Sequence, residues 1–485
     1  MHVKQCEPQR IKGWFYLPEA SDDRVPGILS WEPGDGATLE LIGGFSPRPE
    51  CKSMADSADV YTDELISDVR AGTVYGESDS GKKLSVWDAQ RRNITTNMTG
   101  QVREEFWSSS WVCVGAHIQD PQESAFSSAV IVPDDLYYLT DDGRFAAPRW
   151  ATIDGVDRPG ETLDNGTLLT PYVIPVVGGY RADYAVGEVE VTRYSVCTAA
   201  TRPWISNATE AMPDLKLDMM TRKSRRGPVI ELRVSAKVRI MGSQNQTRSA
   251  ADFIDRCAPV IDLMRMATFG PCGVETIEMT STTGEHVVIL SRAGEPAKPD
   301  EMHRPGSVVF GLADVTFESY LQVRQTLTKE RQGTYAWSVL VGLCGYTSRY
   351  VEEFVSQAVA AAEGFERWCL DGGSEDTLNT RLKNLHNMLP SEVQTLIGLN
   401  VEHWAQWAVW ARNHVAHGGT TRRRIVEDSA QLFAIAETVH LVTYLVAVQQ
   451  LGVPVEKMME ALTNHPRLRV LATKSEVVNE INGLV

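Results

Sequence analysis

The sequence lacks the patterns that mark several common classes of protein. Its most apolar run, residues 439–448, is shorter than a membrane span and contains His440 and Thr443, so we expect no membrane insertion. The first residues lack the apolar segment of a secretory signal, so we expect the chain to be cytoplasmic. There is no Walker loop, no G-x-S-x-G element and no H-E-x-x-H motif. The chain therefore carries none of the best-known signatures of nucleotide hydrolases, serine hydrolases or zinc proteases.

Cysteine and positive charge are also informative by their scarcity. The eight cysteines are scattered without any C-x-x-C pair, so we expect reduced thiols, no metal site and no cofactor. Lysine and arginine number 47 against 63 aspartates and glutamates, which gives a net charge of −16. Such a field repels polyanions at long range. Any contact with nucleic acid must therefore depend on a local basic surface.

The first three hundred residues have the pattern of strands and turns. Alternating or short apolar runs bounded by turn residues predict strands at 27–31, 37–42, 229–240, 274–280 and 286–290. Helical spacing appears within this part at 249–269. Prolines and glycines then accumulate over 293–306, where strand patterning stops. Because 485 residues exceed one ordinary core, we predict a β-rich domain of residues 1–306 and a helical domain of residues 307–485.

Beyond residue 306 the apolar residues recur every three or four positions. This spacing predicts helices over 350–368, 377–389, 401–411 and about 421–451. The last of them is apolar over so much of its circumference that several neighbours must cover it. We therefore predict an α+β multidomain protein that ends in an all-α bundle.

A candidate catalytic pair lies between the third and fourth predicted helices, in Arg412-Asn-His-Val-Ala-His417. RNA carries its own nucleophile, the ribose 2′-hydroxyl, so an arginine and a histidine suffice for cleavage without a metal. The histidine can take up and return the proton, and the guanidinium can stabilise the charge that develops on the phosphate. The expected products are a cyclic phosphate and a free 5′-hydroxyl.

The spacing of this pair is weak evidence by itself, because Arg381 and His386 share it. That second pair lies in an amphipathic helix, and we predict that both side chains are solvated surface. Arg412 and His417 instead precede Gly418-Gly419 at a predicted helix end. Five positions along a regular helix turn a side chain by roughly 140 degrees. Convergence of the pair therefore requires a helix break or a partner chain, such as a two-fold homodimer.

A simpler interpretation of the pair remains open, in which Arg412 caps the helix and His417 terminates it. The surrounding charge favours a site: Arg422, Arg423 and Arg424 lie at the predicted start of the last helix, where positive charge opposes the helix dipole. No acidic residue occurs from Arg412 to Val426. This local basic patch suits RNA binding, although a solvated loop would have the same composition.

The other residues near the motif have secondary roles. Asn413 could orient the histidine or a phosphate, and His414 is a further RNA-binding candidate that is either packed or exposed. Trp404, Trp407 and Trp410 recur every three residues along the preceding helix. Base stacking is conceivable for such a stripe, but we predict that it packs in a core or an interface.

These residues resemble a known family. Arg412-Asn-His-Val-Ala-His-Gly418 is similar to the R-N-x-x-x-H-G element of HEPN domains, and the preceding helices resemble those of ApeA-type HEPN proteins. The segments Gly13-Trp-Phe-Tyr-Leu-Pro18 and Pro26-Gly-Ile-Leu29 resemble the opening of the ApeA N-terminal domain. Glu363 fits a glutamate of the family, and its role stays open.

The resemblance implies an anti-phage abortive-infection protein. Its C-terminal domain would be an endoribonuclease that cleaves host or phage RNA, such as transfer RNA, with Arg412, Asn413 and His417 as catalytic residues. Its N-terminal domain would meet a phage-derived trigger or restrain the nuclease. The alternative is a catalytically silent HEPN module that binds RNA, a nucleotide or a protein partner. A carbohydrate-binding β domain with a helical appendage is a weaker third interpretation.

Overall fold

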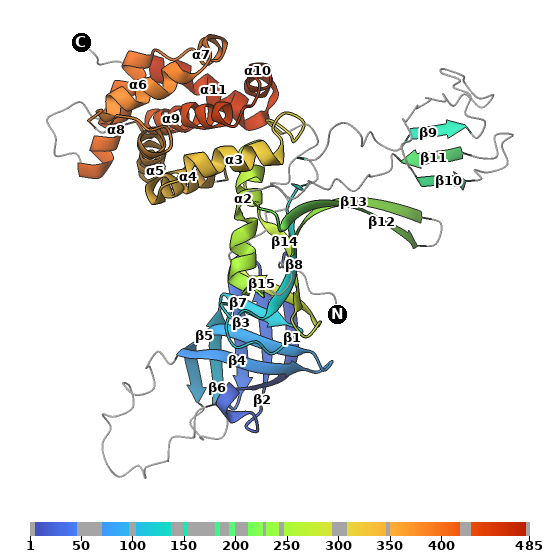
Figure 1. Cartoon of the computed structure of the whole chain (residues 1–485). Helices are drawn as coiled ribbons and strands as arrows, with labels where there is room; N and C mark the ends of the chain where they lie inside the picture. The colour runs from blue at the N-terminus through green and yellow to red at the C-terminus, as the bar shows by residue number, and fades with distance from the viewer. Residues whose placement is uncertain are drawn as a thin grey trace, which may run out of the picture.

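The chain forms a strand-rich N-terminal part and a helical C-terminal part, as Figure 1 shows. The computed structural model describes residues 5–45, 70–96, 103–136, 139, 149–152, 180–184, 194–198, 212–226, 229–241, 247–292, 308–345, 350–373, 375–417 and 428–481. The predicted α+β fold class is confirmed. The expected domain boundary at residues 306–307 lies outside the described residues, so it stays a prediction.

Six antiparallel strands close into a small barrel. They are β1 (Gln9–Tyr16), β2 (Val25–Glu32), β3 (Gly36–Ile42), β4 (Arg70–Ser78), β5 (Lys83–Thr96) and β6 (Arg103–Ser109). The ring runs β5-β4-β1-β2-β3-β6 and closes through the β5–β6 pairing. A short 3-10 helix, Pro18–Ala20, follows β1. Inward-facing residues such as Phe15, Trp31 and Trp107 fill the interior, so the barrel encloses a packed core. The predicted strands at 27–31 and 37–42 are confirmed as β2 and β3, which pair as a hairpin.

The sheet continues beyond the barrel because β5 also pairs with a seventh strand. The added strands are β7 (Trp111–Val114), β8 (Phe126–Pro133), β12 (Leu215–Arg226), β13 (Val229–Met241), β14 (Val274–Ser281) and β15 (His286–Ser291). Their order away from β5 is β7-β15-β14-β8-β13-β12. The bounds of β13, β14 and β15 confirm the predicted strands at 229–240, 274–280 and 286–290. A separate sheet contains β9 (Arg149–Thr152), β10 (Tyr180–Tyr184) and β11 (Tyr194–Thr198).

Helix α2 (Ala250–Thr268) connects the sheet with the helical part, as Figure 1 shows. Ser249 caps its start by accepting a hydrogen bond from the amide of Asp252, as the sequence pattern favours. Farther along, the carboxylate of Asp262 accepts hydrogen bonds from Arg324 Nη2 at 2.8 Å and from Trp337 Nε1 at 3.2 Å. Both partners belong to the C-terminal part, so α2 is fastened to it by charge as well as by packing.

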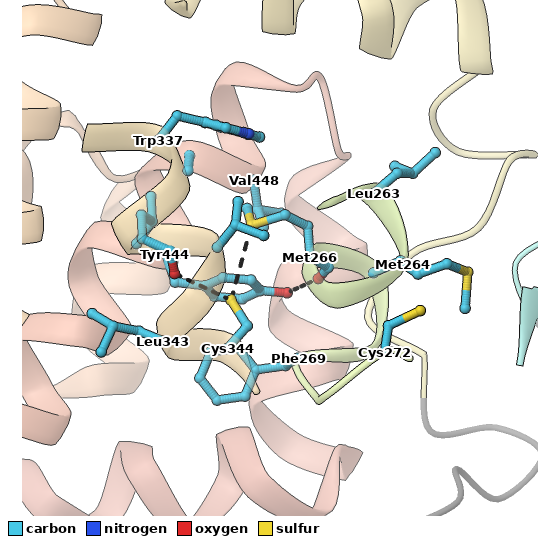
Figure 2. Close-up of a cluster of buried hydrophobic side chains, with 14 of the residues drawn as sticks. Leu263, Met264, Met266, Phe269, Cys272, Trp337, Leu343, Cys344, Tyr444 and Val448 are labelled. Carbon is cyan, nitrogen blue, oxygen red and sulfur yellow. Dashed lines mark hydrogen bonds between the residues drawn. The ribbon is translucent and has the colours of Figure 1, made fainter. Parts of the chain in front are cut away.

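The C-terminal end of α2 is inserted among helices of the C-terminal part (Figure 2). The carbonyl oxygen of Met266 accepts a hydrogen bond of 2.6 Å from Tyr444 Oη. Phe269 leaves the helix with a left-handed φ of 43°, and its carbonyl oxygen accepts from Arg467 Nη1 at 2.6 Å. The same guanidinium atom reaches the carbonyl oxygen of Cys344 at 2.7 Å. One continuous hydrophobic core therefore runs from the extended sheet through α2 into the helices.

The helical part is a bundle built around α9. Its helices are α3 (Phe317–Leu327), α4 (Arg331–Cys344), α5 (Val351–Gly364), α6 (Leu378–Met388), α7 (Ser391–Ile397), α8 (Val401–His417), α9 (Ser429–Gln450), α10 (Val455–Asn464) and α11 (Pro466–Asn479), with a π-helical turn at Phe365–Cys369. By length and composition α9 could cross a membrane, but 83% of its most apolar window is buried inside the chain. It is the core helix of this bundle, which explains why it is apolar nearly all round.

Two predicted helix ends were wrong. The third predicted helix does not stop at Ala411, because α8 continues through His417. The last helix does not begin near Thr421, because α9 starts at Ser429 with Asp428 as its N-cap residue. Asp428 accepts a hydrogen bond of 2.8 Å from the amide of Ala430, an arrangement that satisfies one of the unpaired donors of a helix start.

A buried histidine at the junction makes stability depend on pH. His440 is stacked on Phe269, with ring centroids 5.0 Å apart. Burial first, and Arg467 second, lower the pKa of His440 to about 3. Between pH 6.5, the ordinary value, and about 3, the unfolded chain therefore binds a proton that the folded chain excludes. This contribution to stability is complete above pH 6.5 and is lost as the pH falls.

We predict that His440→Leu flattens the decline of stability with acid. In urea unfolding at pH 7 and pH 5, the wild type should lose up to about 1.4 kcal/mol per pH unit more than the variant. Leucine removes the His440 imidazole and leaves the other titratable groups in place, so the change in stability between the two pH values is the relevant quantity. The exposed His286→Leu change is the control and should leave the wild-type slope intact. Parallel slopes for wild type and His440→Leu would contradict this account.

Candidate active site

Helix α8 carries the candidate motif and is held by a buried stripe. Trp404, Trp407, Ala408 and Ala411 are buried, and Trp404 Nε1 donates a hydrogen bond of 3.0 Å to Thr438 Oγ1 on α9. The tryptophan stripe is therefore packing, as predicted. Because the stripe reaches the buried Ala411, the first residue of the motif, Arg412, directly follows a residue that is packed in the core.

Arg412 is exposed at the point where the buried stripe ends. Its Nη1 donates a hydrogen bond of 3.3 Å to the Oδ1 of Asn413, which is half-buried. Asn413 thus contacts the arginine directly, whereas the sequence had left its partner open between a histidine and a phosphate. The guanidinium has further donors available for a ligand.

Positions 412 and 417 lie on different faces of one continuous helix. Since α8 runs unbroken from Val401 to His417, the two positions differ by roughly 140 degrees around the axis and about 7.5 Å along it. A break between Arg412 and His417, one of the two predicted routes to convergence, is therefore wrong. The other predicted route, a second chain, is consistent with this geometry.

His414 is half-buried and lies between the two catalytic candidates. Its Nδ1 is shielded from solvent and has no hydrogen-bond partner among the described residues. The next residue, Val415, packs against the core and holds this turn of α8 in place. The remaining candidates, Arg422, Arg423 and Arg424, lie outside the described residues, as does Gly418. Their assignment to RNA binding stays a prediction.

The second arginine–histidine pair is not solvated surface, and that prediction was wrong. Arg381 is 1% exposed and His386 is 5% exposed. Arg381 Nη1 donates to the buried carboxylate of Glu366, and its Nη2 donates to the carbonyl oxygen of Gly373 at 2.6 Å. His386 lies against Trp404, and burial lowers its pKa. The pair is part of the bundle's interior and not a second catalytic site.

The π-helical turn explains why this arrangement differs from the amphipathic pattern. Phe365–Cys369 follows α5 directly, and the extra residue in the turn places Glu366 in the interior, 2% exposed. Glu366 Oε1 also accepts a hydrogen bond of 3.0 Å from Asn384 Nδ2. Glu363, which precedes the turn, is only half-buried. A buried carboxylate needs hydrogen-bond donors and an opposite charge; Asn384 and Arg381 supply the donors to Glu366, and Arg381 supplies the positive charge.

One sequence signal could have revealed the buried pair. Arg381 stands four residues before Leu385, at the edge of the apolar stripe of α6, so its side chain can turn inward.

Within the described residues, no group of three or more histidine, cysteine, aspartate or glutamate side chains could hold a metal ion.

Comparison with known families finds two matches that together cover most of the chain. The model described as ApeA N-terminal domain 1 matches residues 10–322. The model described as Apea-like HEPN matches residues 318–457, which include α8 and the candidate motif. No curated protein and no solved structure matches.

We predict that the buried ion pair contributes far more to stability than a surface pair on the same helix. Arg381→Ala leaves Glu366 charged and buried, which should lower the free energy of unfolding by about 3–5 kcal/mol. Lys383→Ala is the matched control, because Lys383 pairs with the exposed Glu402 and its loss should cost less than about 1 kcal/mol. Equal losses in urea unfolding would show that the Glu366 pair is not a structural element.

Proposed function

The chain belongs to the ApeA family and contains an ApeA-like HEPN domain, and on that premise we propose that this domain is a metal-independent endoribonuclease of an anti-phage defence system. HEPN domains are generally of the ribonuclease type. The observation that carries the proposal is the exposed Arg412, paired with Asn413 at the end of a helix anchored in the core. His417 completes the R-N-x-x-x-H element on the same helix.

The proposed reaction needs only the substrate and these side chains. His417 takes the proton from the ribose 2′-hydroxyl, whose oxygen attacks the adjacent phosphorus. Arg412 stabilises the negative charge on the phosphate oxygens, and Asn413 holds the guanidinium in position. The bond from phosphorus to the 5′-oxygen breaks, and that oxygen takes up a proton. The products are a 2′,3′-cyclic phosphate and a 5′-hydroxyl, and host or phage RNA, including transfer RNA, is the substrate class.

The geometry of α8 favours a site built from two copies of the chain. On one continuous helix, positions 412 and 417 differ by roughly 140 degrees around the axis, which disfavours contact of both residues with one phosphate from a single helix. A two-fold axis beside the end of α8 would place Arg412 of one copy near His417 of the other. Arg422, Arg423, Arg424 and His414 would then supply phosphate contacts along the RNA.

The N-terminal part is proposed to control this site in the cytoplasm. Helix α2 belongs to the strand-rich part by sequence, yet its end is bonded to α9 and α11 through Tyr444 and Arg467. A phage-derived trigger that changes the position of the sheet would therefore move α2, and through α2 it would act on α9, which packs against α8. This route requires no mobile linker between the two parts.

We predict that the purified full chain cleaves RNA in the presence of EDTA and that His417→Ala and Arg412→Ala abolish the cleavage. Loss of a proton-transfer residue commonly costs about 10²–10⁴ in rate. The matched controls are Arg469→Ala on the exposed face of α11 and His286→Ala on β15, and both should keep wild-type activity. Full activity of His417→Ala would refute the assignment. Retention of intact RNA by the wild type, with salt-dependent binding, would instead indicate a silent RNA-binding module.

We further predict that two inactive variants restore activity when mixed. In a heterodimer of Arg412→Ala and His417→Ala, one of the two composite sites contains both wild-type residues. Random exchange of subunits should therefore recover about a quarter of the wild-type rate. If Arg412 and His417 acted within one chain, the mixture would stay as inactive as each variant alone.

A further inference from the structure

A polar cleft of about 410 Å³ lies at a corner of the barrel, far along the chain from the HEPN motif. It forms where β5 leaves its partner β7 and begins to pair with β6. Its walls come from four strands, β4, β5, β6 and β7, and from three residues outside the strands. The lining residues are Asp35, Gly72, Asp88, Ala89, Gln90, Arg92, Ser108, Ser109, Ser110, Trp111 and Arg292. A volume of this size holds a small ligand.

The backbone of this corner is irregular at several positions. Asp88 has a left-handed φ of 50°, and Gly72 on the facing strand has a φ of 71°. Ladder irregularities occur beside both residues and again between Arg91 and Asn93. Ser109 Oγ fastens the corner, since it donates to the carbonyl oxygen of Trp111 at 2.8 Å. Ladder irregularities of this kind bend a strand and often redirect side chains beside ligand sites.

Four charged side chains line the cleft without neutralising one another. Asp35, Asp88, Arg92 and Arg292 are all exposed, and none forms an ion pair with another described residue. Among the described residues, Arg92 Nε donates to a neutral oxygen, Ser108 Oγ, at 2.6 Å. Both signs of charge are therefore available to a ligand within one small space.

An aromatic ring completes the cleft. Trp111 is half-buried and packs against the fully buried Trp87, with ring centroids 6.2 Å apart. The indole Nε1 of Trp87 is fixed by a hydrogen bond of 2.7 Å to the carbonyl oxygen of Ile118. Trp111 thus has a rigid support, and the part of its ring that remains accessible can stack on a flat ligand.

We propose that this cleft binds the nucleoside monophosphate unit of a nucleotide. Arg92 and Arg292 would hold the phosphate, because guanidinium groups match phosphate oxygens in charge and geometry. Asp35 and Asp88 would accept hydrogen bonds from ribose hydroxyls or base amino groups, and Trp111 would stack on the base. A simple anion in the cleft would face the two carboxylates without a favourable contact to either. A simple cation would face the two guanidinium groups in the same way. Only a ligand with phosphate, hydrogen-bond donors and a flat ring uses all three kinds of group.

The site is independent of the proposed ribonuclease activity, and binding alone tests it. Isothermal titration calorimetry on the full chain would use AMP, CMP, GMP and UMP, with the four nucleosides and inorganic phosphate as comparisons. At least one nucleotide should bind, at least about tenfold more tightly than its nucleoside or phosphate alone, since each part contributes its own contacts. Absence of binding by all four nucleotides at millimolar concentration would overturn the proposal. So would phosphate binding as tightly as the nucleotides.

Variants locate the binding in the cleft. Arg92→Gln combined with Arg292→Gln should weaken nucleotide binding about tenfold or more, because charge-assisted hydrogen bonds are lost. Asp88→Asn keeps a residue that tolerates the left-handed backbone and removes only the charge, so it should weaken binding without unfolding the barrel. Arg24→Gln is the control, since Arg24 pairs with Glu77 elsewhere on the barrel. Equal affinity in the cleft variants and the control would overturn the assignment.

A final arm distinguishes a free nucleotide from the end of an RNA chain. The His417→Ala protein is titrated with the preferred nucleotide in the presence of an RNA pentamer. Competition identifies an RNA end as the source of the ligand, and its absence identifies a free nucleotide. Both results require the same cleft, which Arg92→Gln with Arg292→Gln should disable in either case.

Discussion

The burial of α9 on every side is the constraint on which the rest of this molecule depends. This 22-residue helix is buried over most of the stretch from Leu432 to Val448, and no single neighbour can cover it on all sides. Helices α5, α8 and α11 cover parts of it, and the end of α2 covers another part through Phe269 and Met266. The strand-rich part of the chain is therefore needed to complete the core of the helical part. This shared core couples the two parts more firmly than a flexible linker would.

The same packing determines what the candidate site can be. Trp404 and Ala411 hold α8 against the bundle, so the helix presents Arg412 from a rigid support. The continuous helix also separates positions 412 and 417 by roughly 140 degrees around its axis. A site assembled between two copies would use the rigidity of each helix and would exist only in the dimer. The geometry therefore links the proposed chemistry to the oligomeric state.

Local sequence patterns predicted the elements well and their ends less well. Alternation over 229–240 and helical spacing over 249–269 identified β13 and α2, because one face of each is buried along its whole length. The end of α8 was predicted too early, since Arg412 and Asn413 look like a helix terminus although Val415 still packs on the core. Arg381 was placed at the surface because its partner Glu366 lies 15 residues away and turns inward only through a π-helical turn. The pairing of Arg381 with Glu366 joins residues 15 positions apart, and the continuation of α8 depends on contacts of Val415 with the core.

The HEPN motif could be predicted from the sequence, whereas the barrel cleft could not. Arg412 and His417 are close in the chain and belong to a recognisable element. The cleft joins Asp35, Asp88 and Arg292, which only the closure of the sheet brings together. A polar site composed in this way has no local signature, because its residues come from separate turns and strand ends.

The central claim is that Arg412 and His417 cleave RNA through the 2′-hydroxyl. Sequencing of RNA ends in cells that express the wild type or His417→Ala tests it most directly, because both the chemistry and the target are read at once. The account predicts new cyclic-phosphate and 5′-hydroxyl ends at defined positions with the wild type and none with the variant. Identical RNA ends in the two cultures under conditions that arrest growth only with the wild type would contradict it.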